Sequence, residues 1–174
     1  MTTYTIDGVH SVADFKVRHL MVTNVRGEFS GVSGSVQFDD ANPANSKVDA
    51  RIDVNTIRTR DDQRDAHLKS PDFFDVEKYP EMTFVSSKVE KNGEGYKVAG
   101  DLTIHGVTKP AVLTVEEFTG ETKDPWGNTK AGVSAKTKVN RKDFGLTWNV
   151  ALEAGGLMVG DDVQITLDLQ LLKQ

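Results

Sequence analysis

The sequence predicts an all-β protein in which eight antiparallel strands close into a barrel. Three observations favour this fold class: apolar and polar side chains alternate over long stretches, turn-forming residues separate those stretches, and the alternation changes phase beside a glycine. Successive side chains of a β-strand point to opposite faces, so each alternating stretch has one apolar face. A sheet of such strands must close on itself or pack against a second sheet to bury that face.

The most regular strand is the last one, in which polar residues separate Val163, Ile165, Leu167, Leu169 and Leu171. A less regular form of the same alternation predicts seven earlier strands. In chain order, the eight predicted strands cover residues 3–6 continuing into 12–19, 24–38, 46–58, 80–91, 95–105, 108–119, 127–140 and 159–173.

Short connections between these strands indicate antiparallel neighbours. Asn42-Pro43 follows the second strand, Asn-Gly-Glu-Gly at 92–95 is typical of a hairpin loop, and His-Gly-Val-Thr at 105–108 is typical of a tight turn. A longer loop, Asp-Pro-Trp-Gly-Asn, occupies 124–128.

Two of the strands contain a change of phase. The apolar positions are odd-numbered up to Phe29 but even-numbered from Val32, with Gly31 between them, and a second change separates Val54 from Ile57. Such a change indicates a bulge or a strong bend. Barrels need bends of this kind at their corners, which favours a closed barrel over an open sheet.

Residues 60–79 do not follow the alternation and predict a short helical insertion over one barrel end. Thr59 is the expected N-cap, and Asp61 and Asp62 suit the positive end of the helix dipole. Pro71 is expected to end the helix or to start a second short turn.

Composition limits the classes of function. A chain of 174 residues without a linker or repeat suits a single domain, 1–174. The net charge of −5 and the scattered lysines argue against nucleic-acid binding. Cysteine is absent, which excludes disulfides and thiolate sites. The N-terminus has no signal-peptide pattern and no stretch suits a membrane span, so we expect a cytoplasmic protein.

No motif predicts catalysis or metal binding. The four histidines, at 10, 19, 67 and 105, do not form a zinc-binding pair on a helix, and Gly31-Val32-Ser33-Gly34-Ser35 lacks the last glycine of a nucleophile elbow. We therefore expect no metal, no cofactor and no catalytic residue. The alternation of small and large inward residues leaves two interpretations open, a tightly packed interior or an apolar tunnel.

Eight segments of the chain, in order, resemble the YceI-like family. They are DGVHS (7–11), FKVRH (15–19), VRGEF (25–29), RDAHLKSPDFFD (64–75), YPEMTF (79–84), GDLTIHGVT (100–108), RKDFGL (141–146) and VGDDV (159–163). The resemblance runs from residue 4 to about 170. It implies a lipocalin-like barrel with a long apolar tunnel, a non-catalytic carrier of polyisoprenoids or other long-chain lipids or quinones, and often a homodimer.

If the protein has this function, the alternate strand positions that face the barrel interior predict a set of lining residues. They are Phe15, Phe29, Ile52, Val54, Phe84, Leu102, Ile104, Val133, Ile165 and Leu167. At the tunnel mouth we expect Phe73, Phe74 and Trp148. Two roles are open for His10, Arg18, His19, Arg58 and Arg60: they donate hydrogen bonds to a ligand head group, or they tie loops to strands.

Residues 145–158 contain three glycines and several adaptable apolar side chains, and they predict either a mobile gate at the mouth or a loop that only plugs the barrel. Two other functions remain open at this point. One is a hydrolase or isomerase that uses His10 or His19 with a nearby acid. The other is a packed barrel that serves as a stress-related interaction module.

Overall fold

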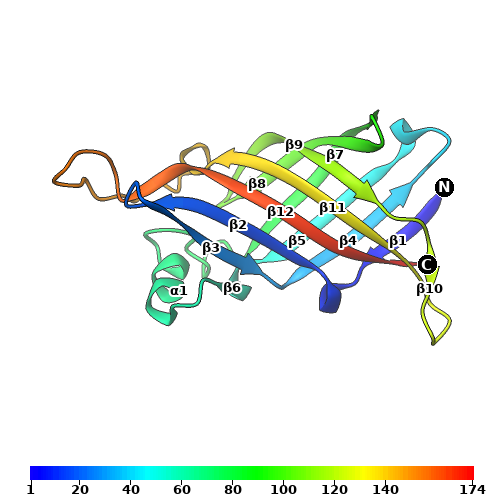
Figure 1. Ribbon diagram of the computed structural model, residues 1–174, viewed down its shortest axis with the longest axis horizontal. Coiled ribbons are helices and arrows are strands. Elements are labelled where there is room, and N and C mark those ends of the chain that lie inside the picture. The colour runs from blue at the N-terminus through cyan, green and yellow to red at the C-terminus, as the bar shows by residue number, and fades with distance from the viewer.

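The computed structural model describes residues 1–174 and confirms a closed antiparallel barrel with one short helix (Figure 1). The strands are β1 (Thr2–Ile6), β2 (Val12–His19), β3 (Thr23–Phe29), β4 (Val32–Phe38), β5 (Lys47–Asp53), β6 (Ile57–Arg58), β7 (Glu81–Asn92), β8 (Gly95–Ile104), β9 (Val107–Phe118), β10 (Thr122–Lys123), β11 (Thr129–Asn140) and β12 (Val159–Lys173).

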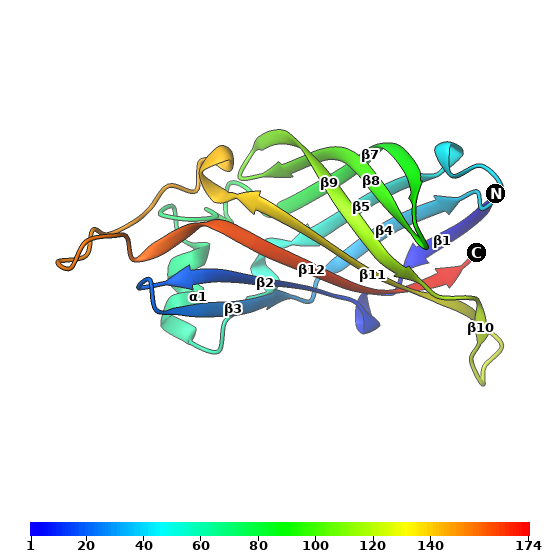
Figure 2. The same ribbon diagram turned by 45° about the horizontal axis from the view of Figure 1, so that its top comes forward.

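The sheet order is β10-β11-β9-β8-β7-β5-β4-β1-β12-β2-β3-β6, and pairing between β11 and β12 closes the barrel. Eight strands, β1, β4, β5, β7, β8, β9, β11 and β12, form the closed circuit. β2, β3 and β6 continue β1, β4 and β5 past a bend: β12 pairs with β1 near its C-terminal end and with β2 in its N-terminal half. β12 therefore spans the barrel, beside β2 at the end that carries α1 and beside β1 at the end that carries the chain termini (Figure 2).

Both predicted phase changes lie at these bends. β3 ends at Phe29 and β4 begins at Val32, and the 3₁₀ turn η3 (Val54–Thr56) separates β5 from β6. Gly31 lies where the two bends meet, because a Cβ at this position would be only 2.8 Å from Cγ2 of Thr56. The close approach explains why a glycine accompanies the phase change.

The predicted insertion is also confirmed, with a correction to its cap. Helix α1 (Asp62–Lys69) is followed by turns that lead to β7. The N-cap is Asp61, whose carboxylate accepts a hydrogen bond from the backbone N–H of Arg64 at 2.9 Å. Thr59 is instead buried and bonds to the side chain of Asp65 at 2.5 Å. No helix of the structure has the length and hydropathy needed to cross a membrane.

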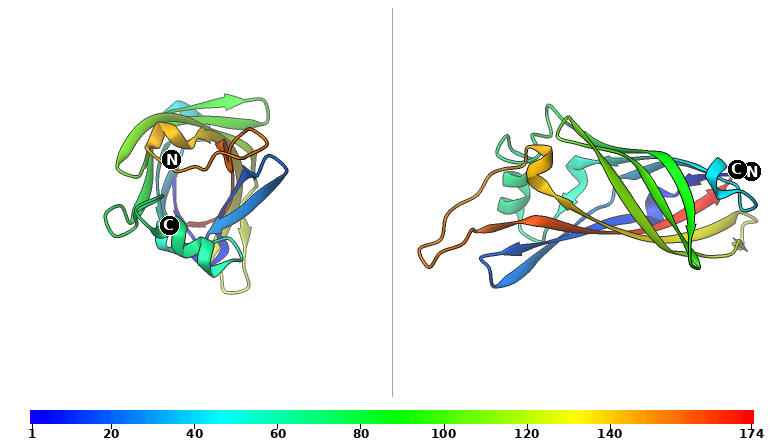
Figure 3. Two further views of the ribbon diagram at one scale, coloured as in Figure 1. Left: turned by 90° about the vertical axis from the view of Figure 1, so that its left-hand side faces the viewer. Right: turned by 90° about the horizontal axis from the view of Figure 1, so that it is seen from above.

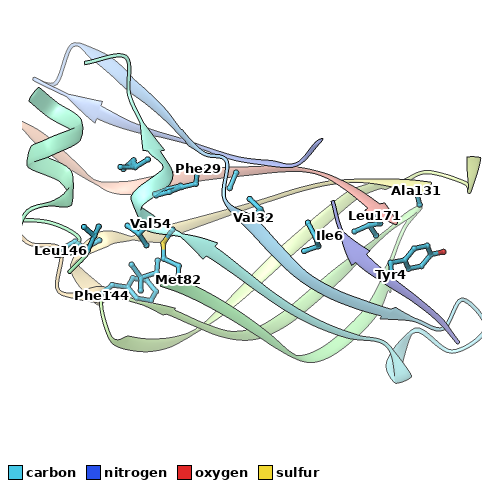
Figure 4. Close-up of a cluster of buried hydrophobic side chains, with 14 residues drawn as sticks. Tyr4, Ile6, Phe29, Val32, Val54, Met82, Ala131, Phe144, Leu146 and Leu171 are labelled. Carbon is cyan, nitrogen blue, oxygen red and sulfur yellow. The ribbon is translucent and has the colours of Figure 1, made fainter. Parts of the chain in front are cut away.

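Most of the labelled buried side chains lie toward the two ends of the barrel, with Val32 between them (Figure 4). Tyr4, Ile6, Ala131 and Leu171 lie toward the end that carries the chain termini. Phe29, Val54, Met82, Phe144 and Leu146 lie toward the end that carries α1. The core is therefore divided between the two ends of the barrel.

Candidate functional site

The barrel contains a cavity of about 530 Å³, lined by 36 residues of which 26 are hydrophobic. Its lining includes residues of α1, of the end of β2 and of the segment before β12, so it opens at the end of the barrel that faces the viewer in the left panel of Figure 3. The volume lies within the ~300–1,000 Å³ typical of small-molecule sites. The interior is therefore not tightly packed.

The inner face of β12 shows how the strands form this cavity. Val163, Ile165, Leu167 and Leu169 line the cavity and are only partly buried, whereas Leu171 is fully buried in the core. The apolar alternation is the same at all five positions. Leu171 differs because it packs beside its strand partner Ile6, so the cavity ends between residues 169 and 171.

Aromatic rings close the barrel beyond this point, and we call them the aromatic plug: Tyr4, Phe38, Tyr96 and Phe118. Ring centroids are 4.8 Å apart between Phe38 and Phe118 and 5.4 Å apart between Phe38 and Tyr96. The Tyr4 hydroxyl donates to Oε1 of Glu121 at 2.8 Å. Burial, and next the contact with Glu121, raise the pKa of Tyr4 to about 12. The cavity is thus closed at this end and open at the other.

The opposite end, the mouth, is bordered by α1 and by the segment that precedes β12. The His67 ring of α1 lies edge-on to Trp148 at 4.8 Å and to Phe73 at 5.1 Å. Phe73 and Trp148 are 5.3 Å apart. His67 Nε2 is also 2.9 Å from Oδ2 of Asp72. Because Trp148 belongs to the 145–158 segment, this aromatic cluster joins the two segments that border the opening.

Further phenylalanines line the cavity wall next to the mouth. The centroid of Phe29 is 5.5 Å from that of Phe15 and 5.9 Å from that of Phe74. Phe15 lies directly across the strand pair from Gly27, and a Cβ on Gly27 would collide with the Phe15 ring. Gly27 is therefore required for the position of Phe15.

A buried arginine organises the segment beside the mouth. Arg141, only 5% exposed, lies in the 3₁₀ turn η4 (Arg141–Phe144) and donates to the backbone carbonyls of Leu146 at 2.6 Å, Gly160 at 2.8 Å, Trp148 at 3.0 Å and Val159 at 3.3 Å. Burial lowers the pKa of Arg141, while the nearby charge of an aspartate opposes this shift. The guanidinium thus fastens both ends of the 146–160 segment to the barrel.

Most polar lining groups lie at the mouth. They include Arg18 and His19 at the end of β2, Asp61 at the cap of α1, and Gln63, Arg64 and His67 within α1. No group of three or more histidine, aspartate or glutamate side chains is placed to hold a metal ion. The cavity therefore offers a long apolar surface with polar groups near its opening.

The structure places eleven of the thirteen predicted apolar residues around the cavity. They are Phe15, Phe29, Ile52, Phe73, Phe74, Phe84, Leu102, Ile104, Trp148, Ile165 and Leu167. Val54 does not line it, because η3 turns this side chain into the core, where it is 1% exposed. Val133 does not line it either, because it pairs with Phe118 of the aromatic plug. The contribution of the eleven residues to binding stays a prediction.

Of the five predicted head-group contacts, only Arg18 and His19 reach the cavity. Arg58 and Arg60 are exposed outside it. His10 is exposed outside the barrel, where its Nδ1 lies 2.9 Å from Oδ2 of Asp7. The hydrogen bond from His10 lowers the pKa of Asp7, and a hydrogen bond from Gln170 adds to this.

Sequence reasoning missed Arg141 and the polar residues of α1. A lone arginine after a strand resembles any exposed charge, and only the folded segment shows that four carbonyls converge on it. The sequence of α1 is polar almost throughout, so it carries no apolar periodicity that would show which side faces the cavity.

Curated relatives resemble the chain over most of its length. A UPF0312 protein of Photorhabdus laumondii is 46% identical over 143 residues, which cover 81% of this chain and 74% of the relative. A UPF0312 protein of Yersinia enterocolitica is 43% identical over 146 residues, with 83% and 76% covered.

Solved structures share the fold. BcnA of Burkholderia cenocepacia aligns with a TM-score of 0.77 at 25% identity, covering 95% of this chain and 98% of BcnA. A YceI protein of Campylobacter jejuni aligns with a TM-score of 0.72 at 35% identity, covering 90% of each chain. A polyisoprenoid-binding domain from Saccharophagus degradans aligns with a TM-score of 0.65 at 18% identity, covering 98% of each. The YceI-like domain model matches residues 4–171, and the chain therefore belongs to the YceI-like family.

Proposed function

We propose that this protein binds and carries a polyisoprenoid or a similar long-chain lipid or quinone, without changing it chemically. One observation carries the proposal: the barrel encloses a cavity of about 530 Å³ that is apolar, open at one end and closed at the other. Its inward side chains stay partly exposed because no protein atoms cover them. An apolar chain that entered would bury surface that folding left uncovered.

The hydrophobic effect is sufficient for useful affinity. Each buried CH₂ group contributes roughly 0.8 kcal/mol, so ten chain carbons contribute about 8 kcal/mol before ordering costs. A binding free energy of about −8 kcal/mol corresponds to a dissociation constant near 1 μM. Immobilising a flexible chain reduces this value, and longer contact along the cavity offsets the reduction.

The polarity of the cavity favours one orientation of the ligand. The aromatic plug closes the end away from the mouth, whereas Arg18, His19 and Arg64 lie at the opening. The apolar tail would therefore enter first, and a polar head would stay beside these three side chains. Arg18 and His19 remain our candidates for head-group contacts.

The length of the cavity sets a limit that can be measured. It follows β12 from residue 159 to residue 169, about 33 Å along the strand at ~3.3 Å per residue. With the ~40° strand tilt of barrels, this is about 25 Å along the barrel axis. Affinity should therefore rise with chain length until the tail reaches the plug, and then level off.

Titration calorimetry of delipidated protein with prenols of increasing length tests this function. Ala50 lines the cavity, whereas Ala99 lies on the outer face, so Ala50→Trp should block binding and Ala99→Trp should not. A negative heat-capacity change should accompany binding, because apolar surface is buried. Equal binding by the two variants would contradict occupation of the cavity.

An enzyme acting on a lipid-like substrate is the second candidate, and one observation favours it. His67 lines the cavity and contacts the carboxylate of Asp72, which is a histidine–acid pair at the mouth. The pair of His10 and Asp7 lies outside the cavity, and so does not serve this function. Turnover of a prenyl ester that is lost in His67→Ala would support the enzyme, and unchanged ligand supports the carrier.

The named ligand of a structural relative supports the choice of lipid class. The domain from Saccharophagus degradans that shares this fold is described as polyisoprenoid-binding. We also propose that the protein forms a homodimer, as the family resemblance implies. Light scattering coupled to size-exclusion chromatography tests this, and a monomer mass at micromolar concentration would contradict it.

A further inference from the structure

Two hairpins at the mouth carry an unusual concentration of exposed apolar side chains. One joins β2 to β3 and the other covers residues 150–158. The molecule has ten exposed large hydrophobic residues, and five of them lie here: Leu20, Met21, Val22, Val150 and Leu157. We call these five residues the mouth patch. The two hairpins project past α1 at the same end of the barrel in both side views (Figure 1, Figure 2).

The two hairpins are joined to each other. The backbone N–H of Leu20 donates to the carbonyl of Met158 at 2.8 Å. The side chain of Met21 lies against Gly156, where Cγ is 3.1 Å from the position of a built Cβ. Two segments far apart in sequence, each with exposed apolar side chains, thus meet at the mouth, which scattered exposed residues would not require.

The conformation of the β2–β3 turn argues against a merely structural tip. Leu20 and Met21 occupy the two central turn positions with φ of 53° and 60°, and Val22 bonds back to His19 at 3.1 Å. Turns of this type favour Asn-Gly, because a positive φ is unfavourable for bulky side chains. Large apolar residues nevertheless occupy this turn, with Met21 57% and Val22 73% exposed. Backbone strain of this kind is associated with functional sites.

Charge on the adjoining strands is arranged by sign. Residues 16–26 contain Lys16, Arg18 and Arg26 but no acidic residue, although the whole chain has a net charge of −5. Lys16 lies directly across from Arg26, and neither forms a salt bridge.

Further from the mouth, the charged side chains on β2 and β3 are acidic instead of basic. Asp14 lies directly across from Glu28, and burial followed by the charges of Glu28 and Asp168 raises the pKa of Asp14. Glu153 is the one acidic side chain between residues 144 and 160. The β2–β3 hairpin itself is therefore basic behind an apolar tip, whereas the acidic side chains at the same end of the barrel belong to other segments and include Asp61 at the cap of α1 and Asp161 and Asp162 of β12.

We infer that the mouth patch inserts into the surface of a lipid bilayer that contains anionic lipids, with Lys16 and Arg26 near the lipid phosphates. An apolar tip with adjacent cations is the composition that binds such surfaces. His19, Met158 and Val159 line the cavity beside the patch, so the docked protein would present its mouth to the bilayer. This inference deepens the proposed function, since it names where a lipid would enter and leave.

Flotation of the full-length delipidated protein with lipid vesicles tests the inference. The protein should bind vesicles of phosphatidylcholine with phosphatidylglycerol more strongly than vesicles of phosphatidylcholine alone, and added salt should weaken the difference. The double variant Met21→Ser, Val22→Ser should bind about tenfold more weakly. Val9→Ser, at a site that is even more exposed but away from the mouth, is the control and should bind like the wild type.

Charge reversal tests the basic half of the surface. Lys16→Glu with Arg26→Glu should weaken binding to the anionic vesicles roughly tenfold or more, and Lys97→Glu on the exposed face of β8, next to the aromatic plug, should not. Wild-type protein that does not bind anionic vesicles would overturn the inference. Equal binding by the wild type and the Met21, Val22 double variant would overturn it too.

A third variant separates this inference from the proposed function. Ala50→Trp fills the cavity but leaves the mouth patch intact, so it should bind vesicles like the wild type. Vesicle binding together with failure to bind any prenol would refute the carrier function and leave membrane docking standing. Prenol binding without vesicle binding would refute the docking alone.

Discussion

Replacing Arg141 by methionine should free the segment that borders the mouth while leaving the barrel folded. The side chain donates to four backbone carbonyls, three of them at 3.0 Å or less. A hydrogen bond from a charged donor contributes about 1.5 kcal/mol at the low end of measured values. The three short bonds then total about 4.5 kcal/mol, from which the cost of burying the guanidinium must be subtracted.

We therefore expect Arg141→Met to destabilise the closed arrangement of residues 146–160 by about 3 kcal/mol. The loss is smaller than the total of the three bonds because the variant buries no guanidinium and because the freed carbonyls regain hydrogen bonds to water. This corresponds to amide exchange about a hundredfold faster across residues 146–160. Arg141→Lys should behave similarly, since one ammonium group cannot reach four separated carbonyls. Hydrogen exchange with mass spectrometry measures this effect.

The exposed neighbour Lys142 supplies the matched control for this experiment. Its ammonium lies 3.4 Å from Asp161 on the surface, and Lys142→Met should leave the exchange of 146–160 nearly unchanged. If Arg141→Met also left that exchange unchanged, the arginine would not fasten the segment and the reasoning would be wrong.

Three further predictions follow from other parts of the barrel. Gly27→Ala should lower the free energy of unfolding by about 1–3 kcal/mol, because the new methyl group collides with the Phe15 ring. Gly120→Ala should leave it unchanged, because a methyl group there enters open space. Thermal melting compares the two variants. The lowered pKa of Asp7 means that its charge stabilises the fold above about pH 4, and that this stabilisation is lost as the pH falls through the folded-state pKa. Urea unfolding should therefore show Asp7→Asn less stable than the wild type near neutral pH, with the difference shrinking in acid, and a constant difference would argue against this linkage. Residues 145–158 should exchange amide hydrogens more slowly in loaded than in delipidated protein, and equal protection in both states would exclude a gate.

The strand arrangement was predictable because each strand has one face toward the interior. The bends were predictable as well, since a phase change beside Gly31 has few other physical causes. The N-cap was misplaced by two residues because Thr59 and Asp61 both suit that position, and only the folded chain shows Thr59 bound to Asp65 instead.

The cavity itself could not be derived from the pattern. Leu169 and Leu171 occupy equivalent positions in one alternating strand, but Leu169 lines the cavity and Leu171 is packed in the core. The difference depends on side chains across the barrel, and the alternation of inward and outward positions along one strand does not specify them. For the same reason the sequence located Phe15 and Leu167 at the cavity but misplaced Val54 and Val133.

The most direct test of the central claim is native mass spectrometry of freshly purified protein. We predict a discrete species heavier than the bare chain, whose extra mass belongs to a hydrophobic molecule that solvent extraction removes. That molecule should keep its mass after prolonged incubation with the protein, and Ala50→Trp should be purified without it. A wild-type protein found only as the bare chain, even after exposure to long-chain prenols, would contradict the account.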